Sequence, residues 1–216
     1  MTGSTAPAPA AAARPGLLRR ALRLEYLTVG WNIIEGLIAI AAGLAAGSVA
    51  LLAFGIDSFV ESASGSVMIW RLLAERNADE DDEVRIEHVE RRAQKLVAGS
   101  LVLLAVYIAW DSITSLLSGE RAAPSAVGIA LAIASLAVMW WLSREKRRVG
   151  IALGSKAMTA DAFQTDACFY LSLFLLVGIG ANALFGLWWA DPLAALGMTV
   201  FIGREALEAW RAEDDD

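Results

Sequence analysis

Long apolar stretches alternate with short charged or glycine- and proline-containing breaks along most of this 216-residue chain. A helix needs about 20 mostly apolar residues to cross the hydrocarbon core of a bilayer, and six of the stretches are of this kind. They cover residues 24–45, 49–73, 96–118, 124–143, 157–181 and 187–209. The pattern therefore predicts an all-α, polytopic membrane protein built as a bundle of six transmembrane helices.

The basic residues gather in the breaks that would share one side of the membrane. Four arginines precede the first apolar stretch, six basic residues lie at or after the end of the second, and four follow the fourth, whereas the opposite breaks contain only Arg121. Short loops rich in Lys and Arg stay in the cytoplasm. We therefore expect both chain termini to be cytoplasmic.

The two ends of the chain differ from the apolar region between them. Residues 1–20 are rich in alanine and proline and lack a long apolar core before a cleavage site, which predicts a disordered cytoplasmic leader rather than a signal peptide. Residues 21–211 would form the transmembrane domain and residues 212–216 an acidic tail. We expect no C-terminal cytosolic domain.

Composition agrees with a lipid-embedded protein. Hydrophobic residues make up 57% of the chain and charged residues 19%, and the mean hydropathy is +0.53, which is typical of integral membrane proteins. We expect a prokaryotic-type plasma (inner) membrane as the location. The formal net charge of −6 argues against a nucleic-acid partner. The single cysteine, Cys168, excludes an intramolecular disulfide and is either a small packed residue or a ligand.

The second apolar stretch contains two acidic residues in "GIDSFVESASG", Asp57 and Glu61. A spacing of four places both carboxylates on one helical face, about one turn apart. An ionisable group deep in a bilayer costs about 2.5–3.5 kcal/mol and usually marks function. Two carboxylates so close repel each other unless a cation lies between them. The pair therefore indicates a cation site.

The fifth stretch carries a second polar stripe in "ADAFQTDAC". At about 100° per residue, Asp161, Gln164 and Cys168 fall within an arc of about 60°, whereas Asp166 points about 140° away from Asp161. Asp166 is thus expected to face another helix or a water-filled vestibule.

If the stripe of the fifth helix faces the acidic pair of the second, two carboxylates, an amide oxygen and a thiolate converge inside the membrane. Five residues are then candidate metal ligands: Asp57, Glu61, Asp161, Gln164 and Cys168. Zn²⁺ accepts thiolate and carboxylate ligands, and Cd²⁺, Co²⁺ or Fe²⁺ would fit the same set. Mg²⁺ and Ca²⁺ would gain nothing from a thiolate. No organic cofactor is expected.

Other polar residues leave two interpretations open. Asn32 and Glu35 share a face of the first helix and Asp111 lies in the third, and each either bonds a neighbouring helix or belongs to a proton or ion path. His88 in "DEDDEVRIEHVERR" is either a solvated loop residue or part of a second metal site.

These motifs resemble the cation diffusion facilitator family, whose members have six transmembrane helices. The family's second helix typically has small-Ser-x-Ala-Leu-Leu-Ala, then Asp or His, three residues and Asp, and "GSVALLAFGIDSFVES" is similar to it with Asp57 and Glu61 at the ligand positions. The family's fifth helix carries Ala-Asp, two residues, His, three residues and Asp. Here Gln164 stands at the His position and Cys168 at the second Asp position.

The resemblance continues along the chain. "AWDSITSLLSGERAAPS" is similar to the family's third helix and outer loop, "GSKAMTADA" to the entry to the fifth helix and "WWADPLAALGMTVFIGREALEAW" to the sixth helix. Glutamine in place of histidine removes a group that titrates near neutral pH. Cysteine in place of aspartate favours softer metals and adds a thiol that must deprotonate on binding.

The resemblance implies a transporter rather than an enzyme. It implies proton-coupled efflux of Zn²⁺ or a related divalent metal by alternating access, with protons displaced by the metal, and a homodimer as the assembly. A non-transporting membrane scaffold or regulator with the same fold stays open as an alternative. An intramembrane metallo-hydrolase would need an activated water and a general base, and the apolar stretches contain neither a histidine nor a His-Glu-x-x-His run.

Overall fold

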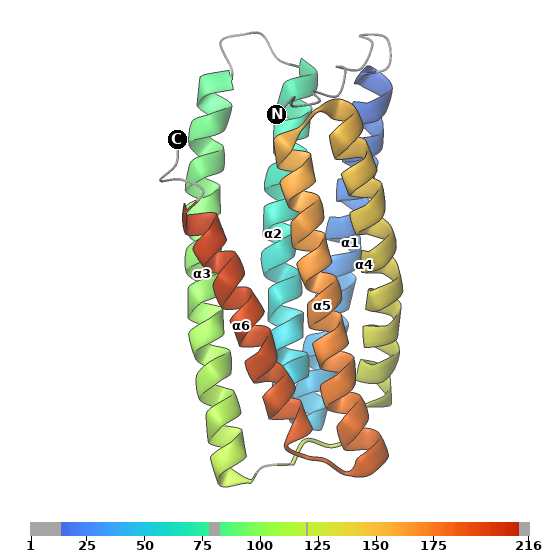
Figure 1. The fold of residues 1–216 in the computed structure, drawn as a ribbon, viewed down its shortest axis with the longest axis vertical. Helices are drawn as coiled ribbons and strands as arrows, with labels where there is room; N and C mark the ends of the chain where they lie inside the picture. The colour runs from blue at the N-terminus through green and yellow to red at the C-terminus, as the bar shows by residue number, and fades with distance from the viewer. Residues whose placement is uncertain (1–13, 78–82, 120, 212–216) are drawn as a thin grey trace, which may run out of the picture.

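A computed structural model describes residues 14–77, 83–119 and 121–211 of the chain, with side chains for residues 14–76, 99, 102–119, 121–155 and 157–204. This part of the chain is all-α and forms six helices, in the order predicted (Figure 1). The helices are α1 Arg14–Ala46, α2 Val49–Asn77, α3 Glu83–Ser118, α4 Ala126–Leu153, α5 Lys156–Phe185 and α6 Ala190–Arg211.

Three helices extend well beyond the predicted apolar stretches. α1 begins at Arg14 instead of residue 24, α3 begins at Glu83 instead of residue 96, and α4 continues to Leu153 instead of ending at 143. Hydropathy marks only the apolar part of a helix, whereas the helix itself continues wherever its charged residues find partners. Residues 14–20 of the predicted leader thus belong to α1, and residues 1–13 and the acidic tail 212–216 lie outside the described residues.

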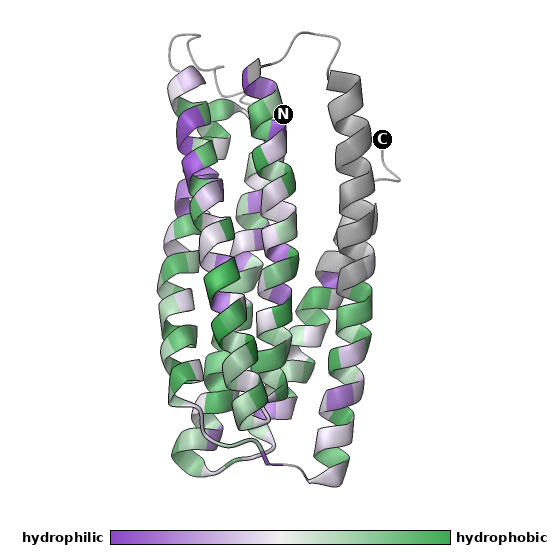
Figure 2. Ribbon diagram, turned by 180° about the vertical axis from the view of Figure 1, so that it is seen from behind, coloured by the Kyte–Doolittle hydropathy of each residue, from purple (hydrophilic) through white to green (hydrophobic). Residues whose placement is uncertain are grey.

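Hydrophilic residues are most frequent toward the upper end of the bundle in Figure 2, and hydrophobic residues predominate below it. Within the described residues, three helices are long and apolar enough to cross a membrane: Arg14–Ala46, Ala126–Leu153 and Ala157–Phe185. The helices alternate in direction, so the start of α1 and the ends of α2 and α4 share one end of the bundle, the upper end in Figure 1, which we call the basic end. The six-span count and the cytoplasmic orientation of the termini stay predictions.

α1, α2, α4 and α5 form a four-helix group, and the pair of α3 and α6 packs against α2 and α5. α1 packs on α2 and α4, and α4 packs on α5, which closes a group around buried faces of all four helices. α3 stands outermost and packs mainly on α6, and α6 also contacts α5 (Figures 1 and 2). The predicted polar stripes of α2 and α5 therefore lie inside the four-helix group.

Glycines bring α1 and α2 into close backbone contact. A Cβ atom added to Gly55 would lie 2.8 Å from Ile40 Cγ1 and 3.0 Å from the Ile40 backbone nitrogen. A Cβ atom added to Gly36 would lie 2.9 Å from Phe59 Cε2 and 3.0 Å from the Gly55 carbonyl oxygen. Small residues commonly allow such close approach between membrane helices. This contact fixes the face of α1 that meets the acidic pair of α2.

We predict that Gly55→Ala destabilises the bundle, because the new methyl group collides with the α1 backbone and overpacking costs about 1–3 kcal/mol. Gly30→Ala is the matched control, since nothing lies within 4 Å of a Cβ atom at that position and alanine favours helix over glycine. The measurement is the melting temperature of each purified variant in detergent. Equal melting temperatures for the two variants would contradict the close contact between α1 and α2.

Candidate metal centre

The acidic pair of α2 is buried inside the four-helix group. Asp57 and Glu61 both point into the bundle, and their charges interact with each other. The serine hydroxyls beside them are already engaged, because Ser58 donates to the Phe54 carbonyl at 2.9 Å and Ser62 donates to the Ser58 carbonyl at 2.9 Å. The carboxylates, rather than the serine hydroxyls, are therefore the candidate ligands of this helix face.

Two residues of the α5 stripe, Gln164 and Cys168, meet α2. Ser64 Oγ donates a hydrogen bond to Gln164 Oε1 at 3.1 Å. One turn earlier on α2 and one turn later on α5, the Glu61 carboxylate lies close to the Cys168 thiol. Cys168 is 4% exposed. The two helices run in opposite directions, which is why these two contacts follow each other in register. The α2–α5 interface thus brings together Glu61, Gln164 and Cys168.

Asp161 has a different partner from the rest of the stripe. Its Oδ2 atom accepts a hydrogen bond from Lys146 Nζ at 2.6 Å, and Lys146 Nζ also donates to Glu25 Oε2 at 3.0 Å. Lys146 is 1% exposed and Glu25 is fully buried. The three side chains form a buried ion triad that joins α1, α4 and α5 near the basic end. Asp161 is therefore held by a lysine rather than by the other candidate ligands.

Neither Lys146 nor Glu25 was predicted from the sequence to lie in a buried cluster. Lys146 lies beyond the predicted end of its stretch at residue 143, so we assigned it to a solvated basic flank. The helical period does indicate that Lys146 is buried. Met139, Leu142 and Val149 are buried and lie seven, four and three residues from Lys146, on the same face of α4.

Asp166 faces α4. Its carboxylate pairs with Arg147, whose guanidinium lies 4.8 Å from the centre of the Phe163 ring. Of the two expectations for this residue, a neighbouring helix or a water-filled vestibule, the structure shows the first.

The other polar residues considered in the sequence, Asn32, Glu35, Asp111 and His88, lie on α1 and α3. Asn32 and Glu35 are buried against α2, and Ser58 Oγ donates to Glu35 Oε2 at 3.5 Å. Asp111 is half-buried on α3. The side chain of His88 lies outside the described residues.

The candidate ligands are neighbours without being drawn into a single shell. In the part of the chain whose side chains are described, no group of three or more His, Cys, Asp and Glu residues is arranged to hold a metal ion. The nearest approach to one is the contact of Glu61 with Cys168, and a second oxygen of Glu61, Oε1, has no hydrogen-bond partner among the described residues. Ligation by the five predicted residues stays a prediction.

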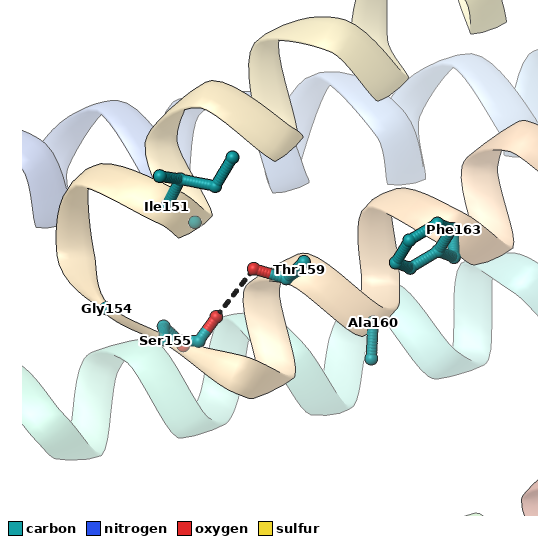
Figure 3. Close-up of a pocket in the computed structure, with 7 residues that line it drawn as sticks. Ile151, Gly154, Ser155, Thr159, Ala160 and Phe163 are labelled. Carbon is teal, nitrogen blue, oxygen red and sulfur yellow. Dashed lines mark hydrogen bonds between the residues drawn. The ribbon is translucent and has the colours of Figure 1, made fainter. Parts of the chain in front are cut away.

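A separate pocket of about 300 Å³ lies at the turn between α4 and α5 (Figure 3). There Thr159 Oγ1 donates to the Ser155 carbonyl at 2.9 Å, which closes the first turn of α5. The lining is largely apolar and includes Ile151 and Phe163. None of the predicted ligands lines this pocket.

We predict that Lys146→Met strongly destabilises the protein, because it leaves two buried carboxylates without a cation, a change that costs about 3–5 kcal/mol in buried ion pairs. Arg148→Met is the matched control, since the Arg148 side chain is 74% exposed and pairs with Glu145 on its own helix, a type of contact that contributes about 0–1 kcal/mol. Melting temperature in detergent measures both. A Lys146→Met protein as stable as the control would show that the triad does not hold the basic end together.

Comparison with known proteins places the fold in a family. Residues 26–212 match the cation efflux transmembrane domain. An uncharacterized transporter of Synechocystis is 32% identical over 153 residues, which are 70% of this chain and 49% of that protein. Magnetosome protein MamB of Magnetospira is 26% identical over 184 residues, which are 85% of this chain and 61% of MamB. MamB of Paramagnetospirillum magneticum is 29% identical over 167 residues, which are 77% of this chain and 56% of that MamB.

The chain spans about half to three fifths of the length of these relatives. Residues 26–212, which match the family, contain the acidic pair of α2, the stripe of α5 and the sixth helix, features that carried the resemblance in the sequence. The chain belongs to the cation efflux, or cation diffusion facilitator, family of membrane transporters of metal cations.

Proposed function

We propose that this chain moves a divalent metal cation across the membrane through a site between α2 and α5. The observation that carries the proposal is the buried contact between the Glu61 carboxylate and the Cys168 thiol. A carboxylate and a thiol that are buried side by side are suited to binding a cation, because both become anionic ligands when the cation binds.

The ligand set that we propose is Asp57, Glu61 and Cys168, with Gln164 as a weaker oxygen ligand. Asp57 lies one turn from Glu61 on the same face, so rotation of the two side chains towards Cys168 would complete the shell. Asp161 is not a ligand in this set, because its carboxylate already binds Lys146. It would act on the site through its charge alone. Zn²⁺ suits the set best, and Cd²⁺, Co²⁺ and Fe²⁺ are its competitors.

Proton exchange follows from the same chemistry. Carboxyl and thiol groups must lose their protons to bind metal, so metal affinity falls as the pH falls and protons are released as metal binds. In the mechanism that we propose, metal enters from the basic end, displaces protons from Glu61, Asp57 and Cys168, and leaves when helix movements open the site to the opposite end and protons return. The basic end would be cytoplasmic and the transport would be efflux.

We predict that Glu61→Gln abolishes metal transport, because it replaces an anionic ligand with a neutral amide. The loss should be at least about tenfold, the smallest effect expected when even a supporting residue of a metal site is removed. Glu75→Gln is the matched control on the same helix, since Glu75 pairs with Arg14 at the basic end. The measurement is Zn²⁺ and Cd²⁺ flux into liposomes under a pH gradient.

Wild-type flux no faster than that of protein-free liposomes would contradict the proposal. Such a result, together with the absence of metal binding, would favour the non-transporting scaffold.

We predict that Cys168→Asp lowers the preference for Cd²⁺ over Zn²⁺, because a hard carboxylate replaces a soft thiolate. Gln164→His should raise Zn²⁺ affinity, because imidazole is a stronger zinc ligand than an amide oxygen. Competition binding of the two metals to each purified variant measures both effects. If neither change alters selectivity, the proposed α5 ligands are wrong.

A further inference from the structure

α1 presses two buried polar residues against the acidic face of α2. Asn32 and Glu35 lie three positions apart and so share one side of α1, and they are 0% and 1% exposed. The next residue, Gly36, meets Phe59 and the Gly55 backbone, which fixes this side of α1 against α2.

The Glu61 carboxylate is the meeting point of three helices. It lies close to the Asn32 amide of α1 and to the Cys168 thiol of α5, and its charge also acts on Glu35. Glu35 Oε2 accepts a long hydrogen bond of 3.5 Å from Ser58, and the Glu35 carboxylate also interacts with Ser135 and Trp31. The polar side of α1 therefore borders the site that we propose between α2 and α5.

Several polar atoms at this meeting point are left unsatisfied. Asn32 Oδ1, Asn32 Nδ2, Glu35 Oε1 and Glu61 Oε1 are buried and complete no hydrogen bond with any described residue. Each such atom costs about 1–3 kcal/mol, and folded proteins contain few of them. Three of the four atoms are oxygens, and one of them belongs to the Glu61 carboxylate, which lies beside the Cys168 thiol. Oxygen atoms with free lone pairs are ligands for a cation and not for an anion.

We propose that Asn32 and Glu35 are additional ligands of the transported cation, so that the site has walls on α1, α2 and α5. The inference rests on the proposed function, because it adds oxygen ligands to the cation held by Glu61 and Cys168. Binding would include rotation of the Glu35 and Glu61 carboxylates towards each other, since the cation removes their mutual repulsion. The site then cannot change its exposure without movement of α1 relative to α2 or α5.

The test is a titration of the purified full chain with Co²⁺, observed by absorption. The thiolate-to-cobalt charge-transfer band reports Cys168, and the ligand-field bands report the number of ligands. Glu35→Gln should weaken Co²⁺ binding at least about tenfold and change the intensity of the ligand-field bands, while the thiolate band persists at saturation. Asn32→Asp, which keeps the size of the side chain and adds a charge, should tighten binding.

Two controls separate ligation from helix packing. Thr28→Val alters a buried polar residue on the same helix whose hydroxyl donates to the Leu24 carbonyl, and Glu145→Gln makes the same chemical change as Glu35→Gln at a residue paired with Arg20 and Arg148. Both should bind Co²⁺ as the wild type does. If Glu35→Gln and Asn32→Asp also match the wild type, α1 supplies no ligand. If the wild type itself shows no thiolate band, the proposed site between α2 and α5 fails, and this inference fails with it.

Discussion

The buried ammonium group of Lys146 sets the arrangement of the basic end. It lies between the carboxylates of Glu25 and Asp161 and thereby links α1, α4 and α5. Removing three charges from solvent is costly unless they compensate one another closely, so the three helices must keep their relative heights and rotations. The pair of Arg14 with Glu75 lies at the same end, is much more exposed and adds little by comparison.

That constraint also sorts the polar residues of α5. With Asp161 fixed by Lys146, the next positions of the stripe along α5, Gln164 and Cys168, meet Ser64 and Glu61 of α2. Asp166 on another face is neutralised by Arg147. Asp161 of α5 thus belongs to a structural ion triad, whereas Gln164 and Cys168 of the same helix lie against α2, where we propose the cation site. In that proposal, an amide and a thiol stand where the family pattern has histidine and aspartate, and they would give the site fewer fixed charges and a softer ligand.

Much of this could be predicted from the sequence. Hydrophobic runs predicted six helices, and the spacing of Asp57 with Glu61 and of Gln164 with Cys168 predicted that each pair shares one face of its helix, because helical period fixes the face of each residue. That the two faces meet was a condition of the predicted metal site and not a consequence of the spacing. The partner of Asp161 could not be predicted, since Lys146 follows an apolar stretch and local pattern does not distinguish a solvated lysine from one folded back into the bundle. The close contact of Gly36 with Gly55 was equally hidden, because a glycine's neighbours depend on tertiary packing. Metal ligation itself stays a prediction.

X-ray absorption at the zinc edge of the purified chain tests the central claim, that a divalent metal binds between α2 and α5 through Cys168 and carboxylate oxygens. We expect one sulfur neighbour at about 2.3 Å and oxygen neighbours at about 2.0–2.2 Å, and we expect the sulfur signal to vanish in Cys168→Ser. A zinc spectrum without sulfur in the wild type, or one that Cys168→Ser leaves unchanged, would contradict the claim.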